Sequence, residues 1–153
     1  AEGLLKLIQE KGDRKPDQAR LDEIKALRAD WDKEIKDLAM EEPAEGTIHP
    51  RRLLYEMMLA KPEDCIVTTD IGNVSSTANS YLRFNNPRLH VACLTNGNTG
   101  FAFQAAMGAK LAAPDQPVMS LAGDGAWGMS FYEVITAVQE NLPVVAVVFR
   151  NNA

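Results

Sequence analysis

The sequence has few of the features that mark a membrane or a secreted protein. No apolar run approaches the ~20 residues that a membrane-spanning helix needs, and the first residues do not form a basic-then-apolar signal pattern. Only two cysteines occur, Cys65 and Cys93, and both lie in strand-like apolar runs. We expect them to be small buried side chains in a reducing compartment rather than a disulfide. These absences predict a cytoplasmic protein with no membrane partner.

Positive charge is also scarce. The 153 residues include 16 Lys and Arg against 21 Asp and Glu, which gives a net charge of −5. A basic patch is the usual mark of a nucleic-acid-binding surface, so no nucleic-acid partner is expected. With 46% apolar and 24% charged residues, the composition is that of an ordinary globular chain, long enough to form a core.

Charged residues are concentrated in residues 1–45, which hold 9 of the 16 basic and 13 of the 21 acidic residues. In this part, apolar residues recur every three or four positions, which predicts one amphipathic helix. They are Leu21, Ile24, Leu27, Trp31, Ile35 and Leu38. Pro16 suits the first turn of this helix, and "EEPAEG" ends it. We interpret residues 1–45 as a charged helical arm, either a connector between domains or an oligomer contact.

Residues 46–153 differ, because short apolar runs alternate there with helical patterns. Thr47 can cap a helix that has Pro50 in its first turn. The expected strands cover residues 65–70, 89–94, 117–122 and 143–149, and the expected helices between them cover residues 74–84, 100–113 and 130–141. Since the strands are apolar on both faces and helices connect them, the sequence predicts an α/β fold, a parallel sheet with helices on both faces.

In such a sheet, ligands bind beyond the carboxyl ends of the strands. The four strand ends read "TTDIGN", "LTNGNTG", "LAGDGAW" and "FRNNA", and each is rich in Gly, Asn, Asp or Thr. Turn chemistry explains part of this, because Gly and Asn are common turn residues. Four such ends in one short sheet predict a clustered binding site.

The third strand end places Asp124 between Gly123 and Gly125, directly before a helical pattern. By itself, "GDG" is equally typical of an Asp-Gly turn. A carboxylate at this point would repel a phosphate unless a cation lay between them. Asp124, Asn151 at 27 positions further along the chain, and a main-chain carbonyl near Ala153 offer the oxygen ligands that Mg²⁺ prefers.

Two other phosphate-binding patterns are absent. The sequence contains no "GxxxxGK[ST]", which excludes a P-loop. It also lacks a full "GxGxxG", so "GNTG" is not the fingerprint of a dinucleotide-binding domain.

The spacing of "GDG" and "NN" resembles the signature of thiamine-diphosphate enzymes, and the likeness to their diphosphate-binding domain covers residues 47–153. The resemblance implies thiamine diphosphate and Mg²⁺ as cofactors. It assigns Asp124, Asn151 and the backbone carbonyl of Ala153 as the metal ligands. The main-chain amides of Gly125 and Ala126, after Gly123, would face the diphosphate.

The other strand ends also match this family. "GNTGFAFQAAMGAKLAA" resembles the glycine-rich segment that holds the aminopyrimidine ring, which assigns Gly97, Asn98 and Thr99 to the cofactor. The carbonyl of Gly97 would accept a hydrogen bond from the 4′-amino group, and Thr99 would support the bent cofactor. "DIGNVSS" places Asn73 to donate to a phosphate oxygen. For Asp70, a structural role and a role in the site remain equally open.

Three stretches are most similar to family members that convert a sulfonated aldehyde and phosphate into acetyl phosphate and sulfite: "TDIGNVSSTANSYLRF", "GNTGFAF" and "AGDGAWGMSFYEVITAV". The alternatives are an acetolactate-synthase-like carboligase or decarboxylase, and a non-catalytic chain that binds a diphosphate. In the family, the glutamate that activates the cofactor belongs to a pyrimidine-binding domain of the same or a partner subunit. The resemblance therefore implies no catalytic residue here, a domain incomplete at its C-terminal end and inactive alone, a small-molecule substrate, and a homo-oligomer, either a dimer or a tetramer.

Overall fold

The computed structural model describes residues 2–12 and 16–151, so the predicted metal ligand Ala153 lies outside the described residues. The chain divides into two compact units, residues 1–34 and 35–153. The first unit contains helix α1 (Glu2–Glu10) and most of helix α2 (Gln18–Ala39). Within the part of the chain that the structure describes, no helix is long and apolar enough to cross a membrane.

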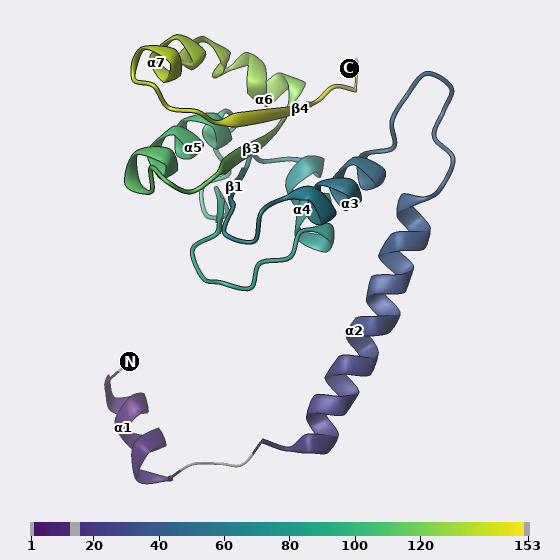
Figure 1. Cartoon of the computed structure of the whole chain (residues 1–153), viewed down its shortest axis with the longest axis vertical. Coiled ribbons are helices and arrows are strands. Elements are labelled where there is room, and N and C mark those ends of the chain that lie inside the picture. Colours follow the sequence, from purple (N-terminus) through teal and green to yellow (C-terminus); the bar gives the residue numbers. More distant parts are fainter. Residues whose placement is uncertain (1, 13–15, 152–153) are drawn as a thin grey trace. The chain divides into compact units, whose positions relative to one another are not determined.

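The second unit is built around a four-stranded sheet. After the last turn of α2, its elements are α3 (Pro50–Ala60), β1 (Ile66–Thr69), α4 (Asn73–Tyr81), β2 (His90–Ala92), α5 (Phe101–Ala112), β3 (Val118–Gly123), α6 (Asp124–Gly128), a 3₁₀ turn (Phe131–Glu133), α7 (Val134–Gln139) and β4 (Val145–Phe149). The strands pair in the order β2-β1-β3-β4, and every pair is parallel. Figure 1 labels three of them, β1, β3 and β4. The predicted parallel α/β sheet is therefore confirmed.

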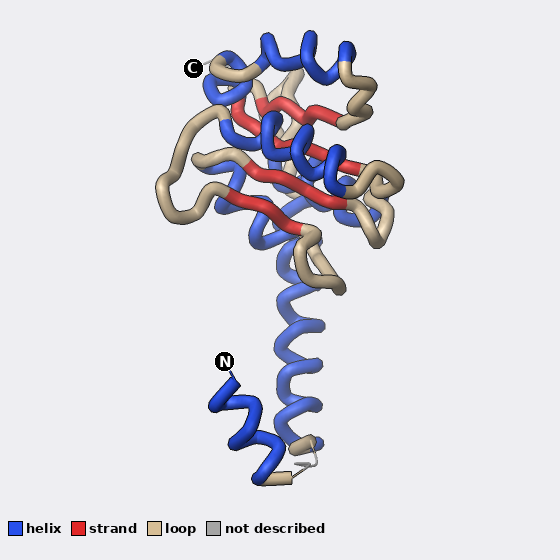
Figure 2. The backbone as a smooth tube through the Cα atoms, turned by 90° about the vertical axis from the view of Figure 1, so that its left-hand side faces the viewer, coloured by secondary structure: helices blue, strands red, loops and turns tan. Residues whose placement is uncertain are grey.

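Helices cover both faces of this sheet. Helix α5 packs on one face against β1 and β3, while α4 packs on the other face and α3 packs on α4. In Figure 2, α5 lies in front of the strands, and α3 and α4 lie behind them. Ala102 and Ala106 of α5 are fully buried, because small side chains let this helix approach the strands closely.

The face under α3 and α4 holds the larger core. Val67 of β1 and Leu121 of β3 pack there with Leu54 of α3 and Tyr81 of α4. The last turn of α2 joins the same cluster, since Ile35 and its neighbour Ala39 are each only 1% exposed. The apolar residues earlier in α2 are exposed, and they are Leu21, Ile24, Leu27 and Trp31. Only the last part of the predicted apolar face of this helix therefore packs in this core.

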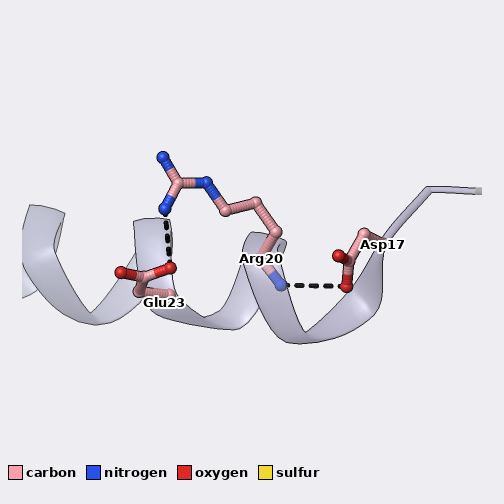
Figure 3. Close-up of polar contacts among 3 residues, drawn as sticks. All are labelled: Asp17, Arg20 and Glu23. Atoms are coloured by element: carbon pink, nitrogen blue, oxygen red, sulfur yellow. Dashed lines mark hydrogen bonds and ion pairs between the residues drawn. The ribbon is translucent and has the colours of Figure 1, made fainter.

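Pro50 lies in the first turn of α3 as predicted, but the predicted cap of α3 and the predicted first turn of α2 are each wrong by two residues. Helix α2 begins after Asp17, not at Pro16, because the Asp17 Oδ1 accepts a hydrogen bond from the Arg20 backbone N at 3.2 Å (Figure 3). Arg20 also pairs with Glu23 at 2.7 Å. Helix α3 is capped by His49, whose Nδ1 accepts from the Arg51 N at 3.2 Å, whereas the Thr47 hydroxyl donates to the carbonyl of Ala44.

The predicted helix over residues 130–141 is also shorter than expected. It splits into the 3₁₀ turn and α7, and a separate short helix, α6, begins at Asp124 itself. The two cysteines are free, and Cys65 is buried while Cys93 is half-buried.

We expect His90 to make the free energy of unfolding depend on pH. Burial lowers the pKa of His90, whose ring stacks on Phe84 and whose Nε2 lies 3.1 Å from the Thr69 Oγ1. The unfolded chain therefore takes up the proton first as the pH falls below about 6.5, so this residue makes folding less favourable at low pH. We expect His90→Gln to reduce the fall in unfolding free energy between about pH 7 and about pH 5. Urea unfolding at several pH values measures this, and an unchanged pH dependence would contradict it.

Candidate cofactor-binding site

The carboxyl ends of the four strands lie at one edge of the sheet because all four strands are parallel. Thr69 at the end of β1 pairs with Ala92 of β2 and with Leu121 of β3. The last pair between β3 and β4 is Gly123 with Phe149. Asp124 and the residues after Phe149 therefore directly follow the paired parts of these two strands. This topology gathers the four polar strand ends that the sequence singled out.

Asp124 occupies the junction between β3 and α6. Gly123 is the last residue of the strand and the N-cap of the helix, and Asp124 is the first helical residue. Asp124 as a whole residue is half-buried, and its Oδ1 accepts an exposed hydrogen bond from the Gly125 N at 3.1 Å. A Cβ at Gly123 or at Gly125 would meet no other atom within 4 Å, so the space beside this turn is open. Ala126 is buried, at 6% exposure.

The glycine-rich loop, residues 97–100, lies close to residues that follow β1 and to the end of α6. Gly97 and Gly100 have φ angles of 61° and 86°, which L side chains rarely adopt. A Cβ at Gly97 would lie 3.7 Å from the side chain of Ile71, which follows β1. A Cβ at Gly100 would lie only 3.1 Å from the Cβ of Met129, which follows α6. The loop is therefore packed closely against the turn that Asp124 begins.

The remaining predicted site residues are accessible. Asn98 and Thr99 are exposed at the outer side of the glycine-rich loop, and the Asn98 N lies 3.2 Å from the Cys93 Sγ. Asn73 is exposed as the first residue of α4. Asn151 is exposed two residues beyond β4. These side chains are in a position to meet a ligand, and their individual roles stay predictions.

The side-chain chemistry of the site suits a hard cation. Among residues 2–12 and 16–151, no three His, Cys, Asp or Glu side chains gather closely enough to hold a metal ion. A metal at Asp124 would therefore have at most two such side chains as ligands among the described residues, and would take the others from amide, carbonyl and phosphate oxygens. Mg²⁺ accepts this set, since it usually binds one or two carboxylates together with phosphates and water.

Asp70 is a site residue whose role the sequence left open. Its side chain is buried, at 1% exposure, and its carboxylate accepts three backbone hydrogen bonds. Oδ1 accepts from the N atoms of Ile71 at 2.9 Å and Gly100 at 3.0 Å, and Oδ2 accepts from the Ala102 N at 2.8 Å. An acidic residue that directly ends an apolar strand run was the only signal for it in the sequence. The structure shows that this carboxylate fastens the glycine-rich loop to β1.

One hollow of the described surface lies away from the strand ends. It is lined by residues 39–43, 47–49 and 52, at the end of α2 and the beginning of α3. None of these residues belongs to the strand ends. The candidate site lies where the strand ends converge, because this edge of the sheet carries the Asp124 carboxylate and the glycine turns.

Sequence comparison decides the family. Residues 70–153, more than half of the chain, match the family described as "Thiamine pyrophosphate enzyme, C-terminal TPP binding domain". The chain belongs to the thiamine pyrophosphate enzyme family. The predicted resemblance is thereby confirmed, and with it thiamine diphosphate and a divalent metal ion as the cofactors that this domain implies.

Two relatives in the thiamine pyrophosphate enzyme family are named sulfoacetaldehyde acetyltransferase. The protein from Castellaniella defragrans is 47% identical over 141 residues, which is 84% of this chain and 24% of that protein. The protein from Alcaligenes xylosoxydans xylosoxydans is 46% identical over 150 residues, covering 87% of this chain and 25% of that protein. The acetolactate synthase large subunit of Parasynechococcus marenigrum is 40% identical over 110 residues, covering 72% of this chain and 18% of that protein. The chain thus spans about a quarter of the length of the acetyltransferases that it matches.

Proposed function

We propose that this chain is the diphosphate-binding part of a thiamine-diphosphate-dependent sulfoacetaldehyde acetyltransferase. The reaction converts sulfoacetaldehyde and phosphate into acetyl phosphate and sulfite. The observation that carries the proposal is the 47% and 46% identity to two proteins of that name over more than four fifths of this chain. Residues 46–153 would form the cofactor-binding domain and residues 1–45 the charged arm.

Asp124 and Asn151 would hold Mg²⁺ together with the carbonyl of Ala153. The position of Asp124, a half-buried residue at the junction of β3 and α6, supports this role. Gly123, Gly125 and Ala126 would accommodate the diphosphate. The open space at the two glycines supports close approach of a ligand to the backbone.

The glycine-rich loop would hold the aminopyrimidine ring through Gly97, Asn98 and Thr99, and Asn73 would donate to a phosphate oxygen. The exposure of Asn73, Asn98 and Thr99 at the same sheet edge as Asp124 supports these assignments. When bound, thiamine diphosphate supplies a carbon nucleophile for carbonyl groups and an electron sink. The residues of this chain would bind and orient it.

The activating glutamate would come from a pyrimidine-binding domain of the same or a partner subunit, in a homodimer or homotetramer. The matching family model is described as a C-terminal domain, which supports a division of the site between this domain and others. By itself, the chain would then bind the cofactor without turning over substrate.

A carboligase or decarboxylase similar to acetolactate synthase is the second candidate. The 40% identity to an acetolactate synthase large subunit favours it, because the cofactor-binding residues would be the same. The two candidates differ in the substrate, and assays distinguish them directly.

We expect the full-length protein, supplied with thiamine diphosphate, Mg²⁺, sulfoacetaldehyde and phosphate, to release sulfite and acetyl phosphate in equal amounts. Sulfite is measured with a thiol-exchange dye and acetyl phosphate as its hydroxamate. The control reaction omits phosphate, and acetyl phosphate should then be absent. No sulfite release would overturn the acetyltransferase assignment, and formation of acetolactate from pyruvate would favour the carboligase.

A further inference from the structure

We propose that Asp70 is a positioning residue, whose buried carboxylate sets the conformation of the glycine-rich loop and thereby the affinity for the pyrimidine half of the cofactor. This inference rests on the proposed function for the assignment of that loop to the pyrimidine ring. It goes beyond that function because it assigns to Asp70 a selective effect on one half of the ligand.

The hydrogen bonds of Asp70 all go to backbone atoms. Its carboxylate accepts from Ile71, Gly100 and Ala102, at 2.8 to 3.0 Å. A buried carboxylate is stable only when its oxygens are hydrogen-bonded or paired, and three amide donors meet this need. Two of these donors belong to the glycine-rich loop and to the first turn of α5. The Asp70 side chain is thus the direct link from β1 to both.

The Asp70 backbone is fixed to a different part of the site. Its N donates to the carbonyl of Leu121 at 2.9 Å, and Leu121 belongs to β3, the strand that leads to Asp124. Asp70 therefore joins the strand that carries the predicted metal ligand to the loop predicted to hold the ring. A change in the Asp70 side chain alters the hydrogen bonds to the loop and leaves the backbone hydrogen bond to Leu121 in place.

The glycine-rich loop depends on this link because it has few side chains of its own. Asn98 and Thr99 are exposed, and the Asn98 N reaches only the weakly accepting Cys93 Sγ. Gly100 is buried and has a φ of 86°, and it lies against Met129. The position of Gly100 is set by the Asp70 Oδ1 on one side and by Met129 on the other.

The test uses two ligands that share only the diphosphate. Inorganic pyrophosphate with Mg²⁺ probes the turn at residues 123–126, and thiamine diphosphate with Mg²⁺ probes the turn and the loop together. Asp70→Asn keeps the shape of the side chain but directs an NH₂ group at one of the three N–H donors. In the full-length protein, we expect this variant to weaken thiamine diphosphate binding by about 10-fold or more, since small displacements of binding groups have effects of this size. Pyrophosphate binding, measured by the same calorimetry, should change less than about 2-fold.

Thr68→Val is the matched control. The Thr68 Oγ1 donates to the carbonyls of Ala102 at 2.7 Å and Met119 at 3.4 Å, so Thr68 also joins β1 to α5, and neither of these acceptors belongs to the glycine-rich loop. The control should lower the melting temperature and leave both affinities unchanged. If Asp70→Asn does not fold, Gly100→Ala replaces it, because a Cβ there strains the same loop from the side of Met129. It should produce the same selective loss.

The outcomes separate the two proposals. If the unmodified protein binds neither ligand with Mg²⁺, the proposed function and this inference both fail. If it binds both and Asp70→Asn, or Gly100→Ala in its place, also binds thiamine diphosphate normally, only this inference is overturned. Equal weakening of both ligands would likewise overturn it, because it would mark Asp70 as a support of the whole fold.

Discussion

Replacement of Asp124 by alanine is expected to weaken Mg²⁺-dependent binding of thiamine diphosphate by at least about 100-fold, since even the loss of an outer-shell partner of a metal ligand costs about 10–100-fold. The predicted metal site contains a single carboxylate, and Asn151 is neutral. Without Asp124, none of the predicted metal ligands from the protein carries a negative charge to attract the Mg²⁺ ion. Titration calorimetry of the full-length protein with the cofactor, with and without Mg²⁺, measures the effect.

Asp115→Ala is the control for this prediction. Asp115 is an exposed carboxylate just before β3, whereas Asp124 directly follows the same strand. The two residues therefore lie at opposite edges of the sheet, and the control variant should bind the cofactor as the unmodified protein does. Mg²⁺-dependent binding of normal strength in Asp124→Ala would refute the assignment of this residue as a metal ligand.

Leu121→Ala is expected to lower the free energy of unfolding by about 3 kcal/mol, within the range of about 2–5 kcal/mol for buried leucines. Leu121 is 0% exposed on β3, in the larger core with Leu54, Val67 and Tyr81. Its loss removes apolar contacts and leaves a cavity beneath α3 and α4, because the packed strand cannot collapse to fill the space. Equilibrium unfolding in urea measures the change.

Leu111→Ala provides the matched comparison, because it removes the same atoms from a leucine that is 65% exposed on α5. A surface substitution of this kind changes the unfolding free energy by less than about 0.5 kcal/mol. Similar effects of the two variants would contradict the position of Leu121 in the core.

Several elements of the fold followed from local patterns. The runs "CIVTTD", "PVMSLA" and "PVVAVVF" predict strands buried on both faces, and the structure has them as β1, β3 and β4. β1 and most of β3 are buried, whereas the residues of β4, the last strand of the sheet, are half-buried or exposed. Helix starts were less certain. Pro16 and Asp17 are adjacent, Thr47 and His49 are only two residues apart, and only the hydrogen bonds at Asp17 and His49 identify the first turn of each helix.

The candidate site shows the same division. Asp124 could be singled out because Gly123, Gly125 and the spacing of 27 positions to Asn151 together form a recognisable motif with it. Asp70 could not be assigned a role, because two of its three partners, Gly100 and Ala102, lie 30 and 32 positions away. No pattern in a single sequence reveals a carboxylate that is satisfied by distant backbone amides.

The sequence by itself therefore determined the fold class, the four polar strand ends and the family, since these depend on apolar periodicity and on residue types at short range or fixed spacing. The tertiary structure decided the order β2-β1-β3-β4, which brings the polar ends together, and the packing of Gly100 against Met129. It also decided that Asp70 holds the glycine-rich loop. The physical reason is that burial and hydrogen bonding depend on which distant backbone atoms lie nearby, and the fold of the whole sheet sets that neighbourhood.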